Sequence, residues 1–177
     1  MLGALWCWPA MSAAALETAA PSTDVVSGMW QHRQLTFNYF GVTALYTCDG
    51  LEDHVRQILL HLGARKDIKA SASGCTGAHS PSHDALVALD FYTLAPATDA
   101  SGTVNARWAP LEMTPLRPRF MGGGDCELIQ QMKDLITQNF SLRNLDYRTR
   151  CPPHGVTIDA FEVKGQALRA IPAPKAT

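Results

Sequence analysis

The sequence predicts an α+β domain of two βαββ units, whose strands form a mainly antiparallel sheet with two helices on one face. Residues 48–75 and 126–151 share one plan, in which a cysteine opens an amphipathic helix and a second cysteine follows the next strand. Strand-like runs lie before and after each segment. The chain has 177 residues, 46% of them hydrophobic, which suffices for one core. We therefore expect one internally repeated domain.

The repetition is one of pattern more than of residue identity. Cys48 and Cys126 lie 78 positions apart, and each begins one of the two segments. Val55 meets Lys133 at this offset, so the match is not strict. The apolar matches are Leu51 with Ile129, Ile58 with Ile136, and Leu62 with Phe140. This pattern indicates structural pseudosymmetry, which an old duplication would produce.

Each helix is predicted from one apolar stripe. The first stripe comprises Leu51, Val55, Ile58, Leu59 and Leu62. Asp49 and Glu52 form the expected N-terminal capping pair of this helix, and Gly63 is expected to end it. The second helix is expected to begin at Asp125 as N-cap. Its buried stripe comprises Leu128, Ile129, Met132, Leu135, Ile136 and Phe140.

Strands are predicted from runs of β-branched and aromatic residues between turn signals. The predicted strands are 35–47, 67–73, 85–94, about 104–113, 143–150 and 156–164. In the first of them the apolar parity changes at Phe40-Gly41, which indicates a β-bulge. Over roughly residues 35–164 this plan resembles a ferredoxin-like sandwich with an additional strand, or two fused βαββ halves. The resemblance is one of topology and implies no activity.

The N-terminus is typical of a signal peptide, which we expect over residues 1–20. An apolar run is followed by small residues, and the one atypical feature is that no Lys or Arg precedes the run. Another kind of amphipathic leader and a buried N-terminal helix are the alternatives. We expect a polar lead-in over 21–34, one disulfide-stabilised domain over 35–165 and a flexible tail over 166–177. The predicted location is periplasmic or secreted, and no later run is long enough to span a membrane.

Four cysteines remain once Cys7 is assigned to the leader. In each repeat a βα connection brings the helix start and the end of the next strand to one edge, which favours the pairs Cys48–Cys75 and Cys126–Cys151. Each bridge would contribute roughly 3.5 kcal/mol on the chain-entropy model. A reactive thiol at a helix start and a zinc site on the four cysteines are the alternatives. Because the sequence contains no CxxC motif, disulfides are the preferred interpretation.

The net charge and the positions of the histidines bear on whether nucleic acid, a membrane or a metal ion is expected as a ligand. A formal net charge of −1 gives no reason to expect nucleic acid or an anionic membrane as partner. His79, His83 and Asp84 share one loop and are the candidate metal ligands, although a loop histidine is more often only solvated. His54 and His61 lie about 10.5 Å apart along a helix at 1.5 Å per residue, so they cannot share one ion.

A binding face is the preferred functional hypothesis. Arg148 and Arg150 alternate with apolar residues on a predicted strand, and Arg143 lies near its start. Such a face suits a protein or an acidic small-molecule ligand, and its plain alternative is a solvated strand. The glycine-rich segment 120–126 lacks a P-loop signature, no GxSxG motif is present, and no cofactor or catalytic residue is assigned. We expect an exported, non-catalytic binding module; a metal-assisted hydrolase and an envelope assembly subunit are the alternatives.

Overall fold

The computed structural model describes residues 25–75, 83–97 and 102–172. The six strands are β1 (Val25–Phe40), β2 (Lys69–Ser73), β3 (Asp84–Pro96), β4 (Val104–Met113), β5 (Leu142–Thr149) and β6 (Phe161–Ala170). The helices are α1 (Cys48–Leu62), the 3-10 turn η1 (Gly123–Asp125), α2 (Cys126–Gln131) and α3 (Lys133–Asn139). The α+β class is therefore confirmed, with three α-helices where two were expected.

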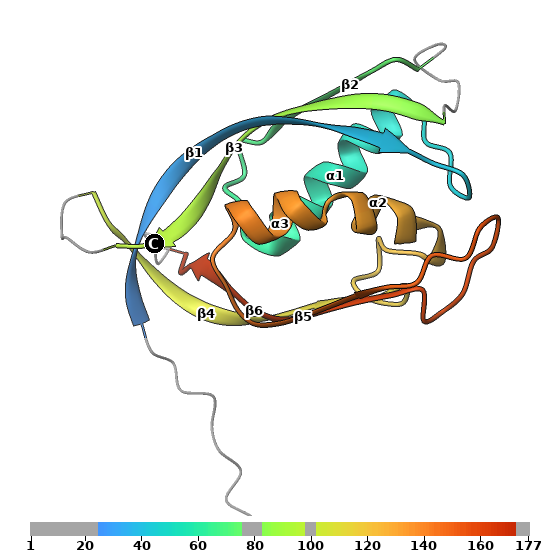
Figure 1. Cartoon of the computed structure of the whole chain (residues 1–177). Helices are drawn as coiled ribbons and strands as arrows, with labels where there is room; N and C mark the ends of the chain where they lie inside the picture. Colours follow the sequence, from blue (N-terminus) through green and yellow to red (C-terminus); the bar gives the residue numbers. More distant parts are fainter. Residues whose placement is uncertain (1–24, 76–82, 98–101, 173–177) are drawn as a thin grey trace, which may run out of the picture.

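The six strands form one sheet in the order β2-β3-β1-β4-β6-β5, and every neighbouring pair is antiparallel. β1 pairs with β3 from Gly28 to Phe40 but with β4 only from Val25 to Gly28. Beyond Gly28 the sheet separates into a β1 wing (β2, β3, β1) and a β4 wing (β4, β6, β5), as Figure 1 shows. The helices lie between the two wings.

The main core fills the space between the wings and includes apolar residues of both wings and of the helices. A second, smaller cluster contains the buried residue Leu168, with Trp30 and Trp108 packed against it. Ala167 belongs to the main core and Leu168 to the second cluster. Since successive strand residues point to opposite faces, the second cluster covers the face of the sheet that is turned away from the helices.

Helix α1 confirms the predicted stripe, because all five of its apolar residues are buried. Gly63 ends the helix at φ 101°, a left-handed conformation that glycine adopts without steric cost. The predicted Asp49 and Glu52 capping pair is wrong. Thr47 is the N-cap and accepts from Gly50 N at 3.1 Å, while Glu52 Oε1 accepts from Ala72 N of β2. A side chain that bridges to a strand cannot also reach back to its own helix start.

The second helical segment is interrupted rather than continuous. All six residues of its predicted stripe are buried, which confirms the face. At Met132 the backbone ψ is −1°, which separates α2 from α3. Asp125 occupies the expected position before α2, but its side chain accepts from Gly122 N at 2.5 Å and so closes the 3-10 turn instead.

Several predicted strand limits need correction. β1 begins at Val25, so residues 25–34 belong to the sheet and do not form a polar lead-in. It ends at Phe40, so the change of parity there marks the end of a strand and not a bulge. β6 spans Phe161–Ala170 where 156–164 was expected, which places residues 166–170 in the sheet rather than in a flexible tail. The start of β1 was predicted too late and the end of β6 too early because polar residues on the outer face of a curved sheet weaken the local strand pattern.

Candidate functional site

One edge of β1 lacks a strand partner over most of its length. Gly41 N donates to His83 O, so the odd-numbered residues of β1 direct their N–H and C=O groups toward β3. The even-numbered residues therefore face the opposite edge, where β4 pairs only as far as Gly28. Among the residues that the structure describes, no strand pairs with this edge from residue 30 to residue 38.

Helices α2 and α3 form the other wall of a groove along this edge. The groove has a volume of about 690 Å³, and every residue of β1 from His32 to Asn38 lines it. Its helical residues are Gln131, Asp134, Leu135, Gln138 and Asn139. The first four of these are spaced three, one and three positions apart, so they share one helix face. A groove that touches consecutive strand residues runs along the backbone edge of the strand rather than across its side chains.

The groove has an apolar floor and amide-rich walls. Leu35 and Phe37 line it while packing against the main core. Five residues with carboxamide side chains also line the groove: Gln34, Asn38, Gln131, Gln138 and Asn139. Of these, Gln34 Nε2 donates to Asp90 Oδ2 and Asn139 Nδ2 to Leu135 O. Arg33 already donates to Gln31 Oε1 at 2.5 Å and lies 3.4 Å from Thr93 Oγ1. With one arginine and one aspartate in its lining, the groove suits an uncharged polar ligand.

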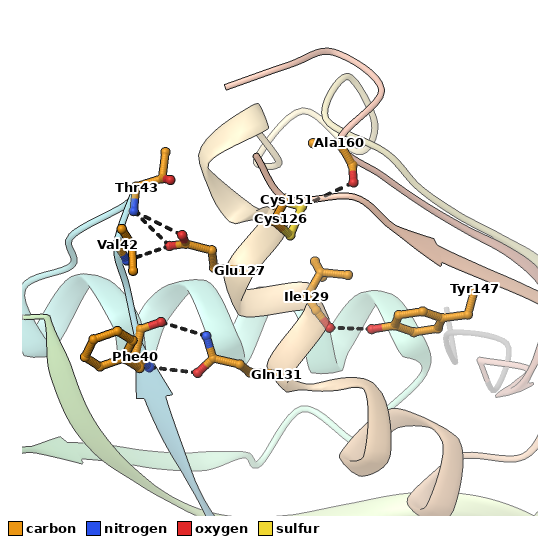
Figure 2. The surroundings of a disulfide bond; sticks show 10 residues. All are labelled: Phe40, Val42, Thr43, Cys126, Glu127, Ile129, Gln131, Tyr147, Cys151 and Ala160. Carbon is orange, nitrogen blue, oxygen red and sulfur yellow. Dashed lines mark hydrogen bonds between the residues drawn. A yellow bond between two sulfur atoms is a disulfide. The ribbon is translucent and has the colours of Figure 1, made fainter. Parts of the chain in front are cut away.

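Figure 2 shows how two side chains of α2 bind the backbone at the end of β1. Gln131 Oε1 accepts from Phe40 N at 2.7 Å, and Gln131 Nε2 donates to Phe40 O at 2.7 Å. Glu127 accepts from Val42 N at 2.8 Å and from Thr43 N at 3.0 Å. Gln131 makes the same pair of bonds that a neighbouring strand residue would make. It therefore occupies one position of an otherwise open strand edge.

The pKa of Glu127 is lowered from its ordinary value. Burial opposes ionisation of this carboxyl, but the backbone N–H groups of Thr43 and Val42 favour the charged form and prevail. Glu127 is therefore a carboxylate at neutral pH, and it holds the loop after β1 against the start of α2.

The Gln131→Glu variant should lower the free energy of unfolding by about 1–2 kcal/mol. A carboxylate accepts from Phe40 N, but it cannot donate to Phe40 O and instead places two oxygen atoms against each other. Gln138→Glu introduces the same charge on a helix residue that makes no hydrogen bond to β1 in the described part of the chain, and should change stability by under about 0.5 kcal/mol. Urea unfolding measures both, and equal losses would contradict this role of Gln131.

A second cluster of titratable groups surrounds the buried carboxylate of Asp125. Tyr46 donates to Asp125 Oδ1, and His54 Nε2 lies 3.0 Å from the same oxygen. The other oxygen of Asp125 accepts from Gly122 N. The rings of Tyr46 and His54 stack at 5.7 Å, and Phe120 meets His54 edge-on at 5.8 Å. Asp125 is only 6% exposed, so this arrangement joins the loop after β1, helix α1 and the turn before α2 through one buried carboxylate.

The ionisation of this cluster follows from its contacts. Burial disfavours the charged form of Asp125, but the interactions with His54, Tyr46 and Gly122 outweigh burial and lower its pKa. Burial and the neighbouring Asp125 charge raise the pKa of Tyr46 strongly. Tyr46 therefore remains a proton donor and Asp125 an acceptor throughout the physiological pH range.

The four late cysteines form the two predicted bridges. Cys48 bonds to Cys75 with S–S 2.05 Å, and Cys126 to Cys151 with S–S 2.04 Å. Figure 2 shows the second bridge beside α2 and close to Ala160. Each bridge connects the first residue of a helix with the segment after the following strand. A closed disulfide removes these thiols from the set of nucleophiles and zinc ligands.

The three predicted arginines lie in different surroundings. The Arg143 guanidinium carbon lies 3.8 Å from the centroid of the Trp108 ring. Arg148 forms ion pairs with Asp146 and Glu162, so its charge is compensated. Arg148 and Arg150 both line a cavity of about 330 Å³ that does not include Arg143. The structure therefore brings two of the three together, beside carboxylates rather than on an open cationic face.

The structure describes two of the three candidate metal ligands, His83 and Asp84. His79 lies outside the described residues. His83 Nδ1 is 2.8 Å from Gly41 O, and Asp84 is the first residue of β3. Within residues 25–75, 83–97 and 102–172, no group of three His, Cys, Asp or Glu side chains is arranged to hold a metal ion. His54 and His61 have separate partners, Asp125 and Glu112 O respectively.

The groove and the Asp125 cluster were both missed by sequence reasoning. The strand was predicted to start at residue 35. The prediction therefore did not include its true start at Val25 or the end of its pairing with β4 after four residues. The only local signal was the polar series Gln131, Asp134 and Gln138 on one helix face, which is also typical of a solvated helix.

No helix in the described part of the chain combines the length and the apolar character needed to cross a membrane. Comparison of the sequence with protein-family models and with curated proteins, and of the fold with solved structures, found no match.

Proposed function

We propose that this protein is an exported, non-catalytic binding module whose ligand lies in the groove between β1 and helices α2 and α3. The observation that carries the proposal is the edge of β1 from residue 30 to residue 38, which faces an amide-rich groove while β4 and Gln131 occupy its two ends. Two disulfides are consistent with an oxidising compartment and so support export.

The non-catalytic part of the proposal is supported by how the titratable groups are used. Tyr46 and His54 are directed at the buried Asp125, and none of the three lines the groove. An acid or base that acts on a substrate must reach it. The polar groups that do line the groove are mainly carboxamides, which bind and orient a ligand but do not exchange protons at neutral pH. Two titratable residues, His32 and Asp134, line it as well, and His32 Nε2 lies 2.8 Å from Asp90 Oδ1.

The fold itself supports an origin by duplication, in which β1-α1-β2-β3 and β4-α2-α3-β5-β6 are two fused βαββ units. The strand order reads β2-β3-β1 in one half and β5-β6-β4 in the other, counted from each edge. The offset of 78 residues that relates Cys48 to Cys126 also relates Trp30 to Trp108 and Arg65 to Arg143. Each of these arginines lies over the tryptophan of its own half, at 5.9 and 3.8 Å. A ferredoxin-like sandwich has the order βαββαβ, and each half here shares the βαββ order with which that fold begins, which supports the ferredoxin-like assignment.

A fragment screen by NMR on the ¹⁵N-labelled chain tests the binding site. Fragments that bind should shift the amide signals of Leu35, Thr36 and Gln131. Gln138→Trp fills the groove with an indole and should weaken that binding at least tenfold, while Thr137→Trp, on an exposed neighbouring position that does not line the groove, should not. Fragments that instead shift residues around Arg148 and Arg150, and bind Gln138→Trp unchanged, would refute the assignment.

A further inference from the structure

We propose that the ligand of this groove is an extended peptide segment, which adds to the free edge of β1 as an antiparallel or parallel strand. This inference rests on the binding function proposed above and names its ligand class. The occupant is a segment of a partner protein with alternating apolar and uncharged polar residues, rather than a small molecule or a second copy of this chain.

The free backbone groups on the edge of β1 have the spacing that a pairing strand requires. Residues at alternate positions of a strand edge each present one N–H donor and one C=O acceptor to that side. Five such residues follow one another here: Trp30, His32, Gln34, Thr36 and Asn38. At about 3.3 Å per residue they match a guest strand of roughly nine residues. The groove lines this edge over His32 to Asn38 without a break.

The side chain of Gln131 already binds this edge of β1 as a peptide group would. Its primary amide gives one acceptor to Phe40 N and one donor to Phe40 O. Phe40 is the next edge-facing residue after Asn38, so the same row of backbone groups already binds an amide at one end. At the other end, Gly28 faces Val104 of β4. A peptide backbone between these two partners would continue the same pattern of hydrogen bonds.

The outer edges of the sheet, formed by β2 and β5, differ from the inner edge of β1. Glu52 accepts from Ala72 N on the outer edge of β2, and Lys69 adds a charge to this short strand. β5 contains an irregularity between Arg143 and Asp146, with Asn144 at φ 51°. Such bulges and charges are the usual protection of edges against unwanted pairing. The register of β1 with β3 has no bulge from 30 to 38, and the one arginine of this stretch, Arg33, is bonded to Gln31 and Thr93.

The position of that edge favours a peptide over a second copy of the chain as the occupant of the groove. The edge lies beside helices α2 and α3 rather than at the outside of the sheet (Figure 1). Pairing of β1 with β1 of another copy would bring the helices of both copies into the same space. A single extended segment fits between β1 and the helices. Its alternate side chains would contact Leu35, Phe37 and Leu135, which makes alternating apolar residues the expected sequence pattern.

The test uses random linear dodecapeptides displayed on phage and selected on the full chain with both disulfides formed. The enriched sequence is then synthesised and titrated into ¹⁵N-labelled protein. We expect shifts at the amides of His32, Gln34, Thr36 and Asn38. Methylation of single backbone nitrogens of the peptide should reduce affinity at least tenfold at every second position and little at the positions between, because only alternate N–H groups face β1.

A matched pair of proline variants tests the protein side. Thr36→Pro removes one groove-facing N–H and leaves the odd-numbered bonds to β3 in place, so the peptide should bind at least tenfold more weakly. Ala70→Pro is the control on the outer edge of β2, where Ala72 N also points away from β3. Ala70→Pro should bind the peptide as the unmodified chain does. The methylation series needs no variant, so the test survives if Thr36→Pro does not fold.

The outcomes separate the two proposals. Groove amides that shift with fragments while no peptide is enriched over uncoated wells would overturn the peptide inference and leave the binding function standing. No shift of a groove amide with either probe would overturn both. A dimer by light scattering that Thr36→Pro converts to a monomer would identify a second copy as the occupant and overturn the peptide inference. A methylation profile without a two-residue period would do the same.

Discussion

Replacing Cys126 and Cys151 together by alanine should lower the free energy of unfolding by about 3.5 kcal/mol or more. The bridge closes a loop with a sequence separation of 25 residues, and the chain-entropy model gives that magnitude for a loop of this length. Loss of packing adds to the entropic effect because Cys126 is 3% exposed and lies at the start of α2. Thermal and urea unfolding of the variant beside the unmodified protein measure the loss.

The other bridge is the natural control. Cys48–Cys75 has a sequence separation of 27 residues, so its entropic effect should be nearly the same. Cys75 and Cys151 are both partly buried, but Cys48 is 9% exposed against 3% for Cys126, and therefore less packing is lost with the first bridge. We expect Cys48→Ala with Cys75→Ala to be the milder double variant. The opposite order would show that packing around Cys126 is not what distinguishes the two bridges.

Asp125→Ala should lower the free energy of unfolding by about 3–5 kcal/mol. The substitution leaves the partly buried Tyr46 hydroxyl and Gly122 N without their acceptor, and it removes the carboxylate next to His54. Removing one partner of a buried ionic and hydrogen-bonded group costs more than an exposed interaction of the same kind. Asp134→Ala, on the exposed part of α3, is the control and should change stability by under about 0.5 kcal/mol.

The pH dependence of unfolding offers a second measurement on the same residue. The folded-state pKa of Asp125 is lowered, so the stability that its charge contributes is fully present above its ordinary value of 3.8. That stability should be lost as the pH falls below this value toward the folded-state pKa. Asp125→Asn should therefore show a shallower loss of stability on acidification than the unmodified chain. Parallel curves for the two proteins would mean that Asp125 does not titrate differently in the folded and unfolded states.

Local patterns predicted the helical part of the fold well, for a physical reason. Burial of one helix face depends on residues three and four positions apart, so the stripes of α1 and of α2 with α3 are encoded within short segments. The cap of α1 was not predicted correctly, because Glu52 bonds to Ala72 across the structure. A side chain with a distant partner gives no local sign of it.

Strand limits were less predictable because β1 changes its surroundings along its length. Its first four residues pair with β4, pairing with β3 begins at Gly28, and residues 32–38 lie beside a groove and α3. Hydrophobic alternation is clear where one face is buried, as at Leu35, Phe37 and Tyr39, and weak where the strand crosses between the wings. The predicted start at residue 35 coincides with the beginning of the clear alternation.

The sequence by itself determined the cysteine pairing, the buried faces of the helices and the α+β class, because each depends on short-range periodicity or on a repeated segment. Only the tertiary structure decided the separation of β1 from β4, the groove beside Gln131 and the meeting of Tyr46, His54 and Asp125. These features depend on sheet twist and on contacts between residues up to 91 positions apart. Local propensity does not encode how far two strands stay paired, since the packing of helices between the wings sets that limit.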